Sequence, residues 1–356
     1  MINAAGKTHL LRLFPLLVAV VLAASSLSGC AQAVAAFQVP AGPPISTPTQ
    51  APSPSVTPLT ANTPIPTVVP TAVPPTPTST VQPTDSLPGP VTIDLVPISS
   101  HFLGNSRTLS VYLPGNYAIQ PQQRFNVLYA NDGQDLAGMD LEQDLNAAYS
   151  ARQMEQIIVV GIPASDDRAN EYGTGTIKNV DGTGARAQDY IDFLIQEVMP
   201  LINDRYRTLS GPEDTALMGW SLGGLTAFYM GWQYPNHFGI TGAFSGSFWW
   251  RTNINSLQDL LASRVVQKMV LDSAASPTLR MWFSAGTGEF PGQDRDHNGT
   301  VDMVQDTTDL VEELAEKGYQ PGTDYLYEQI EGGTHDQATW STVLPDFLQW
   351  AFPPVH

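Results

Sequence analysis

The stretch "TALMGWSLGGLTAFYMGW", residues 215–232, constrains the fold more than any other part of the chain. A short apolar run precedes Gly219, Trp220, Ser221, Leu222 and Gly223, and an apolar helical pattern follows. A G-x-S-x-G pattern between a strand and a helix places its serine on a sharp, exposed turn. The first amides of the helix then point toward that serine. The pattern predicts that Ser221 is a nucleophile, and the alternative is a structural serine in a glycine-rich turn.

Strand and helix patterns alternate through the rest of this region. Strands are expected in "VTIDLVPIS", "RTLSVYLPG", "FNVLYAND", "IIVVGIP", "GITGAFSGS", "LRMWFSAGT" and "DYLYEQIEG". Helices are expected at 139–154, at 185–206 with a bend at Pro200, at 222–234, at 306–317 and at 337–351. The run at 157–163 is apolar on both faces, which is typical of a buried parallel strand. This order predicts an α/β fold with a central, mostly parallel sheet and helices on both faces.

A serine hydroxyl needs a neighbouring base before it becomes a good nucleophile. The chain has six histidines. His335, in "EGGTHDQATW", follows the last predicted strand in a glycine-rich loop. The order serine, acid, histidine along the chain also suits an α/β hydrolase. The sequence therefore predicts His335 as the base.

The third member of such a site is a carboxylate that orients the histidine. Glu289 is the first carboxylate after the strand "LRMWFSAGT", so it is the predicted acid. Asp294 and Asp306 remain as alternatives at this point.

An oxyanion hole needs two backbone N–H donors, one of them directly after the nucleophile. That donor is the amide of Leu222. The loop "YANDGQD" after the third predicted strand offers the amide of Gln134 as the second. The Asn-Asp-Gly sequence in this loop is also an ordinary turn signal.

Several motifs in order resemble the putative-esterase family of α/β hydrolases, which includes the esterase D and enterochelin esterase groups. They are "VYLPGNY", "VLYANDGQD", "RANEYG", "GWSLGGL", "SGSFWW", "AGTGE" and "GGTHDQATW", and the resemblance covers nearly all of residues 91–352. It implies an α/β-hydrolase fold, with Ser221 as nucleophile, His335 as base and Glu289 as acid. The chain departs from the family where a tryptophan often follows the His-Asp pair closely, because Gln337 stands there and Trp340 comes later.

The resemblance and the site leave three functions open. The first is a serine carboxylic ester hydrolase with an acyl-enzyme intermediate and no cofactor required for catalysis. The second is an acyltransferase to a sugar or lipid hydroxyl, which would use the same residues. The third is a non-catalytic surface binding protein on a hydrolase scaffold. Trp249 and Trp250 are predicted either to line a substrate pocket or to belong to the core.

An acidic loop, "DRDHNGTVDMVQD", resembles the start of an EF-hand calcium loop. The oxygen ligands it would offer are Asp294, Asp296, Asn298, Thr300 and Asp302. The match is partial, because Gln305 stands where a bidentate glutamate is expected. A structural Ca²⁺ site and a solvated acidic turn therefore stay open.

The N-terminus predicts an extracytoplasmic protein. Residues 1–29 carry Lys7 and Arg12, an apolar run and then small residues, the pattern of a secretory signal peptide. Cys30, the single cysteine of the chain, ends a "LSGC" sequence that resembles a bacterial lipobox, which predicts lipidation and membrane anchoring. Residues 30–90 are rich in Pro, Thr and Ser and predict an extended linker. Residues 91–356 then form one catalytic domain.

The formal net charge of the 356-residue chain is −18. Nucleic-acid binding depends on neutralising phosphates with Lys and Arg, so this charge argues against a nucleic-acid partner. An ester on an envelope component or polysaccharide suits a tethered, outward-facing enzyme better.

Overall fold

The computed structural model describes residues 89–354. The predicted signal peptide, the lipidation site Cys30 and nearly all of the predicted linker lie outside the described residues, so these remain predictions. Residues 89–354 belong to one compact unit. None of the helices formed by residues 89–354 is long and apolar enough to cross a bilayer.

The centre of the described fold is one eight-stranded sheet in the order β1-β2-β4-β3-β5-β6-β7-β8. The strands are β1 (Thr92–Ser99), β2 (Ser106–Leu113), β3 (Asn126–Asn131), β4 (Ile157–Ile162), β5 (Thr215–Trp220), β6 (Ile240–Phe244), β7 (Arg280–Gly286) and β8 (Tyr325–Ile330). β2 pairs antiparallel with both β1 and β4, and every pairing from β4 to β8 is parallel. The predicted α/β class with a mostly parallel sheet is confirmed.

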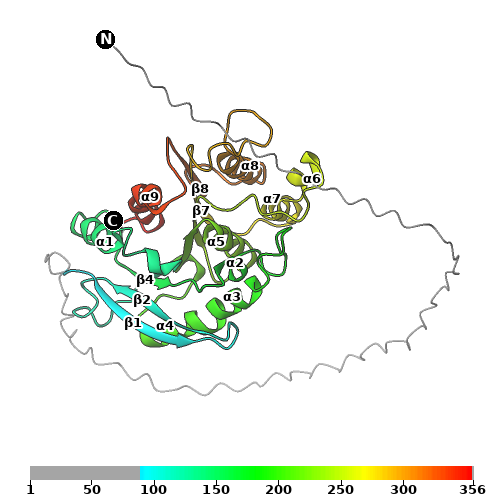
Figure 1. The fold of residues 1–356 in the computed structure, drawn as a ribbon. Helices are drawn as coiled ribbons and strands as arrows, with labels where there is room; N and C mark the ends of the chain where they lie inside the picture. The colour runs from blue at the N-terminus through cyan, green and yellow to red at the C-terminus, as the bar shows by residue number, and fades with distance from the viewer. Residues whose placement is uncertain (1–88, 355–356) are drawn as a thin grey trace, which may run out of the picture. The chain divides into compact units, whose positions relative to one another are not determined.

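Helices cover both faces of this sheet (Figure 1). They are α1 (Leu141–Ser150), α2 (Arg168–Glu171), α3 (Ala187–Phe193), α4 (Met199–Arg205), α5 (Leu222–Gln233), α6 (Leu257–Ala262), α7 (Val265–Asp272), α8 (Asp302–Glu316) and α9 (Gln337–Ala351). Sequence patterns did not predict α2, α6 and α7, which have four to eight residues. Such short helices offer too few turns for an apolar period to emerge.

Two predicted helices differ from the observed ones in an informative way. The segment predicted as one bent helix is α3, a π-helical turn at Leu194–Val198, and α4. Pro200 lies in the first turn of α4, where a missing N–H costs little. The helix predicted from residue 306 begins four residues earlier, at Asp302.

Alternate residues of the central strands enter the two core layers. Leu128, Met218 and Trp282 belong to the layer under α1 and α9. Tyr129 of β3 and Leu217 of β5 face α3, α4 and α5 on the other side. This two-residue period is the period of a strand buried on both faces. Because the strands from β4 to β8 run parallel, their carboxyl ends meet at one edge, where ligands bind in open α/β sheets.

We expect a pH-dependent stability from Glu313 on α8. One of its carboxylate oxygens, Oε2, is buried without a hydrogen-bond partner, and burial raises the pKa of Glu313 to about 7. The folded state therefore holds this proton more tightly than the unfolded state, whose carboxyl titrates near 4.5. The stabilisation is complete below the unfolded pKa and is lost as pH rises through the folded pKa.

Urea unfolding at about pH 4.5 and about pH 8 should show that Glu313→Gln becomes more stable relative to the parent as pH rises. The exposed neighbour Glu312 provides the matched variant, Glu312→Gln, which should show no such trend. Equal pH trends in the two variants would contradict the assignment.

Candidate active site

Ser221 occupies a strained turn between β5 and α5. Its φ is 56° and its ψ is −124°, a conformation that residues other than glycine rarely adopt. The turn is tied to the sheet because the Ser221 amide donates to the Phe244 carbonyl over 2.9 Å. The Ser221 side chain is half-buried, so the turn presents its hydroxyl at the carboxyl edge of the sheet.

The two glycines of the motif allow the close packing that this turn needs. A Cβ on Gly219 would lie 2.6 Å from the backbone of Gly223 and 2.9 Å from the Cβ of Asn131. A Cβ on Gly223 would lie 2.8 Å from a carboxylate oxygen of Asp132. The spacing of the motif therefore follows from contacts with the loop after β3 as well as from the turn itself.

Glu289 and His335 meet at the same edge. Glu289 follows β7 and is wholly buried, and its Oε2 lies 2.7 Å from Nδ1 of His335 in the loop after β8. Its other oxygen, Oε1, accepts hydrogen bonds from the Gly286 amide at 2.7 Å and the Ser245 hydroxyl at 2.5 Å. Three donors thus satisfy this buried carboxylate. Without such partners, burying its charge would cost a large desolvation free energy. The imidazole is left with Nε2 for other partners.

Trp340 joins this network through Ser245 and contacts the imidazole. Its indole N–H donates to the Ser245 hydroxyl over 2.8 Å, and its ring meets that of His335 edge-on, with centroids 5.2 Å apart. Trp340 also stacks on Trp220, the residue before Ser221, with centroids 5.7 Å apart and planes 17° apart. Trp340 of α9 therefore packs against the imidazole and is itself supported by Trp220 of β5.

Ser221 itself contacts a second serine. Its hydroxyl lies 3.4 Å from that of Ser247, and the Ser247 amide donates to the Ser221 carbonyl. Among the hydrogen bonds of residues 89–354, none joins Ser221 to His335. In free enzymes such bonds are often long and tighten when substrate binds.

The two alternative acids lie elsewhere. Asp306 on α8 is wholly buried and pairs with Arg264 and with both terminal nitrogens of Arg295 at 2.7 to 2.8 Å. Asp294 accepts hydrogen bonds from the amides of its own loop. Of the three carboxylates considered from the sequence, Glu289 is the one that contacts His335.

The two predicted oxyanion amides both lie in the first turn of a helix. Leu222 is the first residue of α5, and Gln134 is the second residue of a 3₁₀ turn at Gly133–Asp135. First-turn amides have no acceptor within their own helix. The side chain of Gln134 is engaged elsewhere, because its Oε1 accepts from the Ala164 amide.

Buried side chains join the loop after β3 to the nucleophile turn. The Asn131 amide group donates to the Gly223 carbonyl over 2.8 Å and accepts from the Tyr190 hydroxyl over 2.6 Å. Asp132, in a left-handed conformation with φ 56°, receives two hydrogen bonds from Arg168 at 2.6 and 2.7 Å. Arg168 also donates to the Trp220 carbonyl at 3.3 Å. The two loops that carry the predicted oxyanion amides are thus joined by buried hydrogen bonds.

The electrostatics of this junction are set by burial. Burial alone lowers the pKa of Arg168, but the hydrogen bonds and charge of Asp132 outweigh it and raise the pKa overall. Burial, followed by the charge of Asp132, raises the pKa of Asp135 nearby. Arg168 is therefore firmly charged and already paired.

The two tryptophans predicted for the substrate pocket have different environments. Trp250 is wholly buried, and its indole N–H donates to the Ile177 carbonyl. A side chain without exposed surface cannot line a pocket open to substrate, so that prediction is wrong for Trp250, which belongs to the core. Trp249 is half-buried and packs beside Ala285, Met303 and Val304.

The predicted calcium loop is held by its own hydrogen bonds. Asp296 accepts from the side chains of Asn298 and Gln305. Asp302 accepts from the amide of Arg295, whose guanidinium lies 3.6 Å from it. Within residues 89–354, no three acidic, histidine or cysteine side chains lie close enough to hold a metal ion. That count leaves out the oxygens of Asn298 and Thr300, so calcium binding at this loop, with Asp294 among its ligands, stays a prediction.

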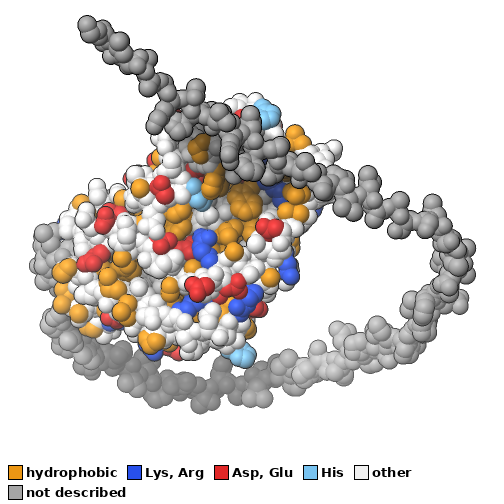
Figure 2. Space-filling model, viewed as in Figure 1, with side chains coloured by type: hydrophobic (Ala, Val, Ile, Leu, Met, Phe, Trp, Pro, Cys, Tyr) orange, Lys and Arg blue, Asp and Glu red, His pale blue; other side chains and the backbone are white. Residues whose placement is uncertain are grey.

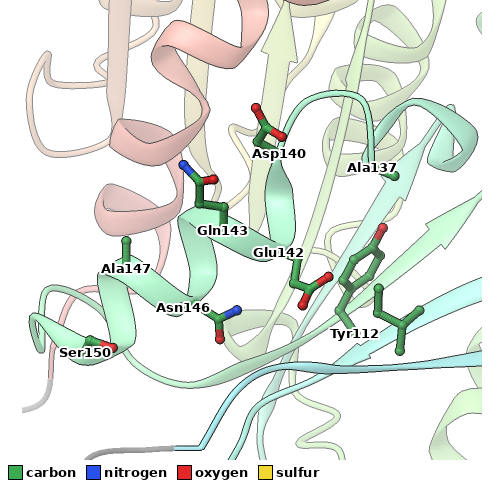
Figure 3. Close-up of a pocket in the computed structure, with 9 residues that line it drawn as sticks. Tyr112, Ala137, Asp140, Glu142, Gln143, Asn146, Ala147 and Ser150 are labelled. Atoms are coloured by element: carbon green, nitrogen blue, oxygen red, sulfur yellow. The ribbon is translucent and has the colours of Figure 1, made fainter.

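A hollow of about 620 Å³ lies between α1 and β2 (Figure 3). Side chains of Tyr112, Glu142, Gln143 and Asn146 line it, and none of the predicted site residues does. The chemistry of the site therefore points to the sheet edge at Ser221, and not to this hollow.

Sequence reasoning missed most of the supporting residues. Ser245 and Trp340 stood in motifs already noted, "SGSFWW" and "GGTHDQATW", but nothing in the sequence showed that they meet. Asp132 and Arg168 also stood in two noted motifs, "YANDGQD" and "RANEYG". Their opposite charges were the one available signal for the pair.

The fold and this set of side chains define an α/β hydrolase. A family model described as Putative esterase matches residues 100–351, and the chain belongs to that family and is an ester hydrolase. The family resemblance seen in the sequence is thereby confirmed.

Individual relatives match the chain over different lengths. Uncharacterized protein YbbA of Bacillus subtilis (strain 168) is 25% identical over 260 residues, which are 72% of this chain and 96% of the relative. The iron(III) enterobactin esterase of Escherichia coli (strain K12) is 30% identical over 94 residues, 26% of this chain and 22% of that protein.

Solved structures show the same fold. An enterobactin esterase from Shigella flexneri aligns with a TM-score of 0.60 and 21% identity, over 76% of this chain and 62% of that one. A ferulic acid esterase aligns with a TM-score of 0.57 and 15% identity, over 75% of this chain and 99% of that one.

We expect the Arg168–Asp132 pair to contribute strongly to stability. Arg168→Met leaves the carboxylate of Asp132, 1% exposed, without its partner. Removing one partner of a buried pair typically costs about 3–5 kcal/mol, and partial exposure of Arg168 places this case near the lower figure. Urea unfolding measures the loss.

The matched variant is Arg186→Met, since Arg186 is about as exposed as Arg168 but pairs with the exposed Asp167 and Asp189. Its ion pairs should contribute less than about 1 kcal/mol. Equal losses in the two variants would contradict the importance of burial at Asp132.

Proposed function

We propose that the chain is a serine carboxylic ester hydrolase in which Ser221, His335 and Glu289 act as nucleophile, base and acid. The observation that carries the proposal is the buried Glu289 bound at 2.7 Å to Nδ1 of His335, at the sheet edge where the strained Ser221 turn lies. A carboxylate on Nδ1 fixes the tautomer in which Nε2 can accept a proton.

The proposed reaction has two steps with the same residues. As the Ser221 oxygen attacks the ester carbonyl, Nε2 of His335 takes the hydroxyl proton and then gives it to the departing alcohol. Water repeats the sequence on the acyl-enzyme and releases the acid. The amides of Leu222 and Gln134 would donate to the oxygen that becomes negative in each step.

The comparisons support the class of substrate only broadly. Relatives in this fold are named for ferulic acid and for enterobactin. Esters of aromatic acids are therefore the first natural substrates to test, and the chain's strong negative charge favours uncharged ones.

The direct test combines turnover of p-nitrophenyl acetate with fluorophosphonate labelling. Ser221→Ala should abolish both, because the attacking oxygen is gone. His335→Ala should reduce turnover by at least about 10³-fold. Ser247→Ala should still be labelled, since Ser247 lies beside the nucleophile without replacing it. A folded parent protein that neither turns over nor labels would disprove the proposal.

A second test asks whether Glu289, and not Asp294 or Asp306, is the acid of the site. In Glu289→Gln, Oε1 can keep its two donors, so the side-chain NH₂ faces Nδ1 of His335. Nδ1 must then accept, and Nε2 carries the proton, which prevents it from acting as base. We expect kcat/KM to fall by about 10³- to 10⁴-fold.

The matched variant is Asp294→Asn, which removes a loop carboxylate that does not contact His335. Its kcat/KM should stay within about twofold of the parent value. A loss in Asp294→Asn comparable to that in Glu289→Gln would refute the assignment of the acid.

A further inference from the structure

Phe290, the residue directly after Glu289, is held in an unfavourable conformation. Its φ is 43°, in the left-handed region that favours glycine. Its side chain is 40% exposed, although it is a large apolar group. An exposed aromatic residue in a strained backbone is a combination that folding alone does not select, and strain of this kind concentrates at functional sites.

The aromatic contact of Phe290 is the imidazole of His335. The two ring centroids lie 4.6 Å apart, with planes 41° apart. Trp340 meets the same imidazole edge-on and is itself anchored through Ser245. The imidazole therefore has two aromatic neighbours, Trp340 buried in the core and Phe290 partly open to solvent. Figure 2 shows hydrophobic side chains gathered beside a histidine near the middle of one face of the molecule.

The chemistry of the site predicts which half of the ester lies beside the exposed ring of Phe290. With Nδ1 bound to Glu289, Nε2 delivers the proton to the oxygen of the departing alcohol. The bond from Ser221 to the acyl carbon forms, the bond from that carbon to the alkoxy oxygen breaks, and the alcohol leaves with the proton from His335. The alcohol must therefore lie beside the imidazole, whose partly exposed aromatic neighbour is Phe290.

We propose that Phe290 determines specificity for the alcohol half of the ester by forming an apolar wall that packs against an aromatic or similarly bulky, uncharged alcohol. This inference rests on the proposed function. The charges near the site agree with an uncharged group, because Arg168 is already paired with Asp132 and Asp336 next to His335 is an exposed carboxylate. An anionic alcohol would meet repulsion there.

The test uses the whole chain in detergent and three esters that vary one half at a time. Benzyl acetate and ethyl acetate differ in the alcohol, and ethyl phenylacetate places the ring on the acyl half. Phe290→Ala should lower kcat/KM for benzyl acetate by about tenfold, the effect expected for one lost aromatic contact. The values for ethyl acetate and ethyl phenylacetate should stay within about threefold.

Two further variants and one control complete the design. Unlike Phe290→Ala, Phe290→Tyr should keep the parent preference for benzyl acetate over ethyl acetate. Phe290→Leu should keep part of that preference. Leu257→Ala removes another exposed apolar side chain, on α6, and should leave all three substrates unchanged. Melting temperatures should confirm that every variant is folded.

The outcomes are distinct. Equal losses of kcat/KM for all three esters would overturn the inference, because Phe290 would then act only by packing against the imidazole of His335. A selective loss for ethyl phenylacetate would place the ring on the acyl side and would overturn it as well. A parent protein that is folded but neither labels with fluorophosphonate nor hydrolyses any of the esters would instead overturn the proposed function.

Discussion

The close approach of the Ser221 turn to the loop after β3 is the constraint on which the rest of the site depends. Glycine at 219 and 223 lets the two backbones meet, and the amide group of Asn131 links them by bonding the Gly223 carbonyl. This contact ties the loop that precedes the 3₁₀ turn to the first turn of α5. Without it, a strained serine turn would have no fixed partner across the sheet edge, and charge developing on a bound ester would meet no preorganised donors.

Two buried carboxylates add rigidity to this junction in different ways. Glu289 is satisfied by an imidazole, a hydroxyl and a backbone amide, so it orients His335 while remaining compatible with a buried position. Asp132 is satisfied by one guanidinium and holds α2 against the nucleophile turn. In both cases the desolvation of a charge is offset only because the partners arrive in the right geometry, which makes the surroundings of the site intolerant of loose packing.

The sequence predicted the class of fold because strand and helix periods are local properties. The strands at 157–162 and 215–220 and the helix at 337–351 were evident from apolar patterns alone. The short helices α2, α6 and α7 were not, since a helix of four to eight residues shows little periodicity. Trp249 and Trp250 illustrate a second limit, because adjacent residues with the same chemistry differ in burial, and burial depends on what the fold packs against each one.

By itself, the sequence determined the order of the elements, the turn that carries Ser221, and the candidates His335 and Glu289, because each follows from a local pattern and from position along the chain. The tertiary structure decided which carboxylate contacts His335, a pairing across 46 residues. It also decided that Arg168 reaches Asp132, 36 residues away, and that Phe290 covers the imidazole. Such contacts depend on how the strand ends converge at one edge of the sheet, and no local pattern in the chain encodes that convergence.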